Sequence, residues 1–73
     1  MTQKVMIHCF QDVRKVVAAA ASCIDEIGVH DARGSIADAK SILGLMSLDY
    51  SHPVMVVSEN ERELQHVVRA LAQ

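Results

Sequence analysis

Hydrophobic and polar residues alternate near the start of the chain and then change to a helical spacing. Residues 4–10 alternate between two faces, which predicts a strand with His8 and Cys9 on opposite sides. Asp12 is a suitable N-cap residue, and the apolar positions after it recur every three or four residues. The pattern therefore predicts a strand followed by an amphipathic helix over about 12–23.

The rest of the chain switches between the same two periods. Gly34 closes a polar turn between two short apolar stretches, which predicts a hairpin. Ser41 or Asp38 can cap the next helix, and the segment from Ser58 to Glu61 matches the Ser-x-x-Glu capping box before a last helix. The predicted elements are strands over 24–30, 35–37 and 54–57 and helices over 41–48 and 59–72.

The order of these elements is β-α-β-β-α-β-α, in one domain over residues 1–73. Each predicted helix has a single apolar stripe, so each needs one surface to pack against. Helices of this kind interspersed with short strands are typical of a two-layer α+β sandwich. We expect the helices on one face of the sheet and solvent on the other.

Composition and charge narrow the class of function. The chain has 73 residues, 3% of them aromatic, with seven Lys and Arg against nine Asp and Glu. A nucleic-acid-binding domain needs a basic face or an aromatic platform for bases, so nucleic acid is not expected as a partner. The longest apolar run, 16–21, is far short of the roughly 20 residues that span a bilayer, and no signal-peptide pattern is present. We expect a cytoplasmic protein with no membrane partner.

The cysteines and histidines do not form a known catalytic or metal-binding motif. Cys9 and Cys23 allow at most one bridge, and we expect two buried, reduced thiols. The pair His8-Cys9 alone does not supply the ligands of a zinc site. The four histidines are spread one to an element, at His8, His30, His52 and His66. We therefore expect no metal, no cofactor and no enzyme activity.

The segment after the predicted hairpin carries a specific motif. It reads Ala37-Asp38-Ala39-Lys40-Ser41-Ile42-Leu43-Gly44-Leu45-Met46-Ser47-Leu48. This resembles HPr, the histidine-containing phosphocarrier family of the bacterial sugar phosphotransferase system, which has Asn-Ala-Lys-Ser-Ile-Met-Gly-Leu-Met-Ser-Leu there. The resemblance covers about residues 27–73, and the first third matches only in the order of its elements. It implies an HPr-like open-faced β-sandwich, whose four-stranded antiparallel sheet is covered on one face by three helices.

The first third departs from the family where the family keeps its chemistry. The family's Gly-Leu-His-Ala-Arg-Pro motif lies between the first strand and the first helix, and its His passes a phosphoryl group from enzyme I to a sugar permease component. Here the stretch reads His8-Cys9-Phe10-Gln11-Asp12-Val13-Arg14, in a shorter loop, with no Gly before it and no Arg-Pro after it. Asp12 puts a carboxylate where a phosphate needs positive potential. His8 is thus a displaced phosphoacceptor or an ordinary strand residue, and Cys9 a phosphocysteine or a structural thiol.

Ser41 matches the family's regulatory serine, which a dedicated kinase and phosphorylase act on in many Gram-positive bacteria. A phosphate there adds about −1.5 to −2 charge beside free backbone N–H groups and a favourable helix dipole. The same serine can act simply as an N-cap worth about 1 kcal/mol. The two roles are compatible, so both stay open.

The helix after Ser41 has barely two turns and cannot bury every apolar side chain it carries. By resemblance, Ile42 and Met46 match positions that the family exposes for docking to partners. Each of Ile42, Leu43, Met46 and Leu48 belongs either to the core or to a docking interface. Lys40 lies at the edge of this interface or is simply solvated. The predicted partner-binding residues are Lys40, Ile42, Leu43, Met46 and Leu48.

These observations lead to one hypothesis and two alternatives. The hypothesis is an HPr-like docking or regulatory module with a Ser41 phosphorylation site and no standard phosphohistidine. Its partners would be phosphotransferase-system proteins, a serine kinase and phosphorylase, or a transcription regulator. The first alternative is an active phosphocarrier that uses His8. The second is an ACT-like ligand-sensing module, which shares a β-α-β-β-α-β order.

Overall fold

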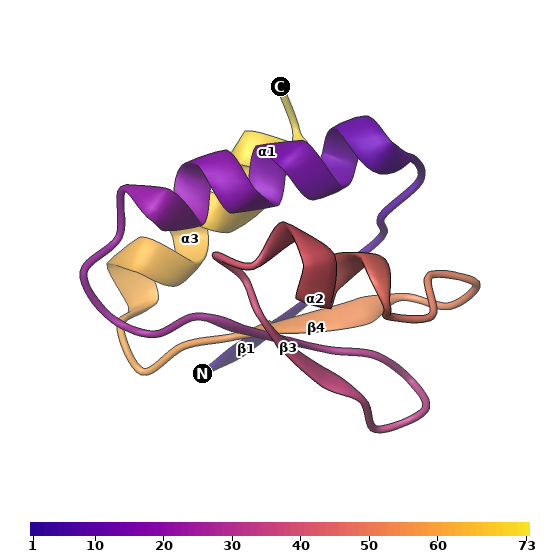
Figure 1. Cartoon of the computed structure of the whole chain (residues 1–73). Helices are drawn as coiled ribbons and strands as arrows, with labels where there is room; N and C mark the ends of the chain where they lie inside the picture. The colour runs from indigo at the N-terminus through magenta and orange to yellow at the C-terminus, as the bar shows by residue number, and fades with distance from the viewer.

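The computed structural model describes all 73 residues and has the expected α+β class. The elements follow one another in the predicted order along the chain (Figure 1). They are β1 (Thr2–Val5), α1 (Phe10–Ala21), β2 (Gly28–His30), β3 (Ile36–Asp38), α2 (Ile42–Met46), β4 (Val54–Val57) and α3 (Glu61–Leu71). None of the helices is long and apolar enough to cross a membrane.

The four strands form one antiparallel sheet in the order β1-β4-β2-β3. The last strand in sequence, β4, therefore lies in the interior between β1 and β2. The pairing aligns Val5 with Val54 and Val29 with Val56, so all four valines lie on one face of the sheet. This face carries the buried side chains of β2 and β4.

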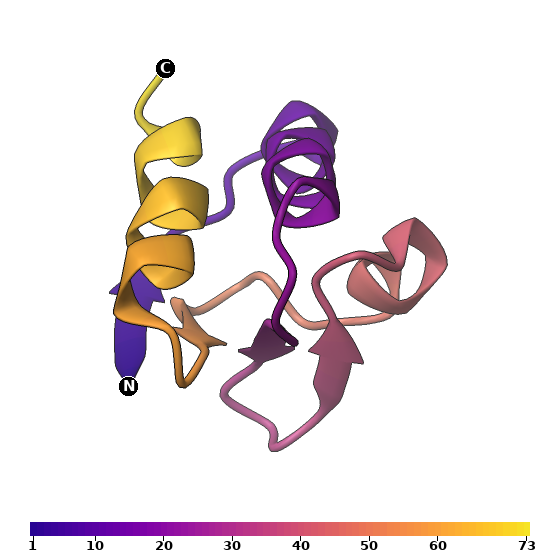
Figure 2. The ribbon, with the colours of Figure 1, turned by 90° about the vertical axis from the view of Figure 1, so that its left-hand side faces the viewer.

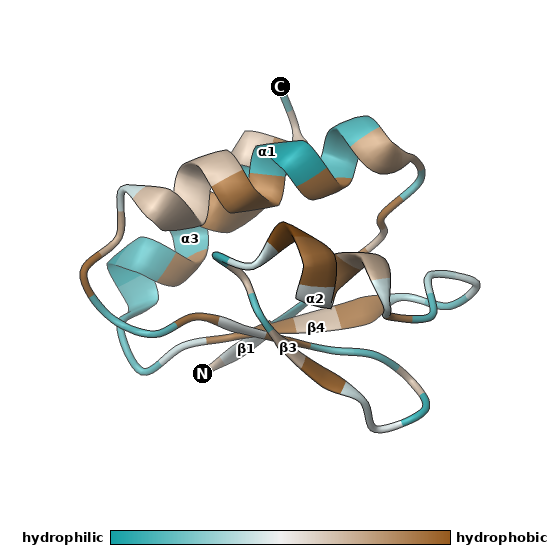
Figure 3. Ribbon diagram, in the orientation of Figure 1, coloured by the Kyte–Doolittle hydropathy of each residue, from teal (hydrophilic) through white to brown (hydrophobic).

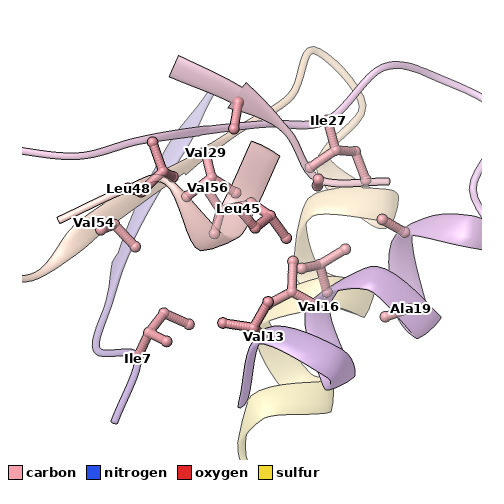
Figure 4. Close-up of a cluster of buried hydrophobic side chains, with 14 of the residues drawn as sticks. Ile7, Val13, Val16, Ala19, Ile27, Val29, Leu45, Leu48, Val54 and Val56 are labelled. Atoms are coloured by element: carbon pink, nitrogen blue, oxygen red, sulfur yellow. The ribbon is translucent and has the colours of Figure 1, made fainter. Parts of the chain in front are cut away.

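All three helices cover that face of the sheet, and no element covers the other face (Figures 1 and 2). The layer between helices and sheet is filled by aliphatic side chains (Figure 4). The largest fully buried side chains are Ile27, Leu45, Val54, Val56 and Val67. The open-faced two-layer arrangement is thus confirmed at the level of layers and sheet.

The amphipathic helices follow their sequence pattern. Hydrophobic and hydrophilic segments alternate along α1, and α3 begins with a hydrophilic turn (Figure 3). On α1 the buried stripe includes Val13, Val16 and Ala20, and on α3 it includes Leu64 and Val67. These stripes pack against each other and against the sheet, which explains the helical periods in the sequence.

The predicted strand over 4–10 is wrong from Met6 onward, and the strand begins earlier than predicted, at Thr2. β1 ends at Val5, because β4 supplies only four residues to pair with it. The predicted N-cap is also wrong: Cys9 holds that position, and Asp12 lies in the first turn of α1. The Asp12 carboxylate accepts the backbone N–H of His8 at 2.9 Å, which turns the chain into the helix three residues earlier than predicted.

The second strand and the last helix begin later than predicted, at Gly28 and Glu61. Ile24 and Asp25 are not in β2, because their backbone N–H groups donate to the Glu63 carboxylate at 2.8 and 2.9 Å. The predicted capping box from Ser58 is wrong as well. Asn60 is the N-cap of α3, and its side chain accepts the backbone N–H of Glu63.

Several local predictions are confirmed. β4 has the predicted bounds, and β2 and β3 form the predicted hairpin. Gly34 adopts a φ of 88° in the turn, a conformation in which side chains other than glycine are strained. Of the two proposed caps for α2, Ser41 is the one used.

Candidate functional site

The exposed hydroxyl of Ser41 lies at the start of α2. Its Oγ accepts the backbone N–H of Gly44 at 3.1 Å, and its carbonyl accepts the N–H of Leu45 at 3.0 Å. The backbone of Ser41 is extended, as expected of an N-cap residue. Ser41 therefore combines a capping role with a hydroxyl that solvent can reach.

Gly44 makes room for this cap. A Cβ atom at Gly44 would lie 3.1 Å from the Ser41 Oγ and 3.4 Å from the Ala37 Cβ. The first separation is tighter than ordinary van der Waals contact and the second is at its lower limit, so a side chain would press on the serine hydroxyl. The absence of a side chain at Gly44 thus leaves room for the Ser41 hydroxyl to cap the helix.

Lys40 is engaged within the fold. Its Nζ donates to the carbonyl of Cys23 at 3.0 Å, just beyond the C-terminal end of α1. A cation at this end of a helix complements the helix dipole. Its backbone N–H also donates to the Asp38 carboxylate. The ammonium group therefore ties the residue before Ser41 to the connection between α1 and β2.

The apolar side chains of α2 divide between surface and core. Leu43 is 78% exposed and Met46 is 56% exposed. Ile42 is half-buried and packs against the core at the edge of a shallow groove beside α1. Leu48 is only 7% exposed and belongs to the core, so its predicted role in docking is wrong. The short helix buries Leu45, and Leu48 is buried just beyond its C-cap, whereas Leu43 and Met46 stay exposed.

The groove beside Ile42, which we call the α1–α2 groove, has a volume of about 410 Å³. It is lined by Gln11, Arg14, Lys15, Val17, Ala18 and Ile42. Three of the lining residues are apolar, and α1 contributes two cationic residues to the lining. Ile42 is therefore the only α2 residue that borders the groove, and the exposed Leu43 and Met46 lie outside it.

The structure places His8 and Cys9 differently from the prediction. His8 lies in the connection before the helix, is exposed, and is not in a strand. Cys9 is also exposed, which corrects the expectation of a buried thiol, and its side chain makes no capping hydrogen bond. Only Cys23 is buried; its thiol donates to the carbonyl of Ala19, and burial raises its pKa.

The electrostatics at this helix start do not favour a phosphate. Asp12 directs its carboxylate to the N–H of His8, so that donor is already used. The nearest cation to Asp12 is the Nζ of Lys15, at 4.0 Å, and this ammonium also donates to the carbonyl of Gln73. A phosphate on Cys9 or His8 would therefore meet a carboxylate already present in the first turn.

Asp31 and Glu63 join segments that are distant in sequence, and the sequence pattern did not predict either role. Asp31 is 7% exposed and accepts the backbone N–H groups of Arg33, Ser35 and Asp49. The N–H of Asp49, followed by those of the hairpin turn, holds the pKa of this carboxyl below its usual value. An Asp at the first position of a turn with Gly at the fourth is the signal that could have found it. Glu63 has no comparable local signal.

The structure does not group three or more His, Cys, Asp or Glu side chains in a way that could hold a metal ion. No family model matches the chain, and no curated protein is significantly similar to it.

Proposed function

We propose that this chain is an HPr-like docking and regulatory module, which is controlled by phosphorylation of Ser41 and acts in the cytoplasm. The observation that carries the proposal is the segment from Lys40 to Met46. It forms a capped helix with an exposed serine at its start and exposed Leu43 and Met46 beside it. The element order and the open-faced sheet agree with what the resemblance to HPr implies.

Phosphorylation would change this surface through charge. The Ser41 Oγ would form a new P–O bond with the transferred phosphoryl group and lose its proton, while the kinase's nucleotide leaves as the diphosphate. The ester adds about −1.5 to −2 charge at pH 7. Leu43 and Met46 must lose their water to dock, and a strongly hydrated dianion beside them makes that loss costly. The unmodified form would therefore bind an apolar partner more tightly than the phosphorylated form.

Phosphorylation at Ser41 can be tested by treating the chain with the serine kinase of the phosphotransferase system and mapping the product by mass spectrometry. We expect one phosphate, on Ser41. Ser41→Asn should abolish labelling and keep the cap, because Asn is as good an N-cap as Ser. Ser47→Ala is the matched control, since Ser47 lies at the other end of the same helix and its hydroxyl donates to the Gly44 carbonyl. Labelling on Ser47, or none at all, would leave Ser41 only its capping role.

One observation favours the alternative of an active phosphocarrier. Cys9, and not His8, lies at the N-cap of α1, the place where the family stabilises its phosphorylated residue. Incubation with enzyme I and phosphoenolpyruvate distinguishes the two functions. We expect no stable phosphoryl transfer, because Asp12 opposes the anion. Transfer that His8→Ala or Cys9→Ser abolishes would instead identify the acceptor and establish a carrier.

A further inference from the structure

Residues 23–25, in the connection between α1 and β2, are held by side chains that approach them from two directions. From α3, the Glu63 carboxylate accepts the last two of their backbone N–H groups at 2.8 and 2.9 Å. From the segment before α2, the Lys40 ammonium donates to the carbonyl of Cys23 at 3.0 Å. This part of the chain, here called the 23–25 stretch, is therefore fixed by two side chains of opposite charge.

The 23–25 stretch lies at the surface, beside the largest hollow of the molecule. The Ile24 side chain is 91% exposed. The hollow has a volume of about 890 Å³, and the carboxylates at its border belong to Asp25, Glu26, Glu59 and Glu61. None of these four carboxylates is within 4.0 Å of a Lys, Arg or His nitrogen. The stretch thus positions an exposed apolar side chain next to an acidic border.

The Lys40 ammonium has no anionic partner in the unmodified chain. The Cys23 carbonyl is a neutral acceptor, and no carboxylate lies within 4.0 Å of the ammonium nitrogen. The acidic residue nearest in sequence, Asp38, accepts the backbone N–H of Lys40 instead. A cation binds an anionic acceptor more strongly than a neutral one, because the attraction of two full charges adds to the hydrogen bond. The ammonium would therefore exchange the carbonyl for an anion within its reach.

Phosphorylation would place such an anion on the adjacent residue. A phosphoserine carries about −1.5 to −2 charge at pH 7 and three acceptor oxygens, and a lysine ammonium lies at the end of a flexible four-carbon stem. We propose that Lys40 couples phosphorylation of Ser41 to the 23–25 stretch: its ammonium leaves the Cys23 carbonyl for the phosphate, and the stretch loosens. This coupling rests on the phosphorylation of Ser41 proposed above.

After this exchange the 23–25 stretch is held from the α3 side alone. The contacts that remain are those of Glu63 and of the Asn60 amide, which donates to the Asp25 carboxylate at 2.9 Å. The exposed Ile24 side chain and one carboxylate of the acidic border then become more mobile. Phosphorylation of Ser41 thus acts on a second surface, in addition to the exposed side chains of α2.

Total chemical synthesis of the full chain, with Ser41 phosphorylated and ¹⁵N at Ile24 and Asp25, tests the coupling without a kinase. We expect the phosphate to accelerate hydrogen exchange of both amides about fivefold. In ³¹P NMR, the second ionisation of the phosphate should occur at a lower pH than in Lys40→Met, because a nearby cation favours the dianion. Unchanged exchange of both amides, or the same ionisation with and without the lysine, would overturn the proposal.

Two lysine variants show whether the response depends on Lys40. In Lys40→Met the amides of Ile24 and Asp25 should exchange faster even without phosphate, and phosphorylation should change them no further. Lys4→Met is the matched control, because Lys4 lies in β1, and this variant should keep the response. A response that survives in Lys40→Met contradicts the coupling.

The coupling and the proposed function fail in different ways. If the serine kinase does not label Ser41, the proposed function fails, and the synthetic phosphorylated chain still decides whether Lys40 couples the two sites. If the kinase labels Ser41 and the exchange of Ile24 and Asp25 stays the same, only the coupling is overturned.

Discussion

Asp31 connects two parts of the chain that are far apart in sequence. One carboxylate oxygen accepts the N–H groups of Arg33 and Ser35 within the hairpin turn, and the other accepts the N–H of Asp49 in the loop after α2. Hydrogen bonds to a charged acceptor are roughly twice as strong as those between neutral groups. The turn and the loop are therefore held in register by an ionised side chain.

Because of these hydrogen bonds, the stability of the fold depends on pH. The hydrogen bonds lower the pKa of Asp31 in the folded chain below its unfolded value. A carboxyl of this kind contributes stability that is fully present above the unfolded pKa and is lost as the pH falls through the folded pKa. We expect the urea midpoint to fall as the pH is lowered below about 4.

Asp31→Asn should lower the urea midpoint at pH 7 and flatten its decrease in acid. The amide group of Asn offers one acceptor oxygen, so its NH₂ must face at least one of the three N–H donors. Glu26→Gln is a control with an exposed carboxyl, and it should keep the acid dependence. An unchanged acid profile in Asp31→Asn would show that other carboxyls cause it.

Ser41 and Gly44 should be energetically coupled. Ser41→Ala removes the cap and should cost about 1 kcal/mol. Gly44→Ala gains about 1 kcal/mol of helix propensity but places a Cβ 3.1 Å from the Ser41 Oγ, which displaces the hydroxyl. In the Gly44→Ala background, removal of the hydroxyl should therefore cost little. A double-mutant cycle by chemical denaturation measures the coupling, and strict additivity would contradict it.

At the scale of the elements, sequence reasoning succeeded where the signal is local. The turn at Gly34, the cap at Ser41 and the bounds of β4 depend on residues within a few positions of one another. The end of β1 was missed because the alternation continues through Phe10, whereas the length of its partner strand decides where pairing stops. A single sequence pattern does not contain that information.

The candidate site also has features that the local sequence predicts and features that it does not. The cap at Ser41 and the exposure of Met46 follow from the motif and the shortness of the helix. The exposure of Leu43 and the partial burial of Ile42 do not follow from the motif, which matches Ile42 to an exposed position. The bond from Lys40 to the Cys23 carbonyl joins residues 17 positions apart, so no local pattern could predict it. Cys9 was missed as the N-cap because Cys is not among the residues that favour this position.

The poor cap of α1 can be improved. Cys9→Ser supplies an oxygen that can accept a free N–H of the first turn, and it should stabilise the chain by about 1 kcal/mol. Cys23→Ser should do the opposite, because it places a hydroxyl among buried apolar side chains. Thermal unfolding followed by circular dichroism measures both. Destabilisation by Cys9→Ser would imply that the thiol makes contacts beyond its capping position.

At the scale of the whole molecule, Glu63 links α3 to the connection between α1 and β2. Its carboxylate accepts two backbone N–H groups 38 and 39 residues away. Glu63→Ala should cost about 2 kcal/mol, since both bonds are charge-assisted and partly exposed. Hydrogen exchange of Ile24 and Asp25 should accelerate in this variant. Glu59→Ala is the control and should leave both amides protected, because Glu59 is exposed and outside this contact.

The interior position of β4 has a consequence for how the chain folds during synthesis. β1 pairs with no strand other than β4, and β2 needs β4 to join the rest of the sheet. A nascent chain that ends before Val54 therefore has two helices and the β2–β3 hairpin but not the four-stranded sheet that the helices cover. We expect ribosome-bound chains to acquire stable structure only after nearly the whole sequence has emerged from the exit tunnel, in one late step. Shorter nascent chains should be open to proteases and chaperones.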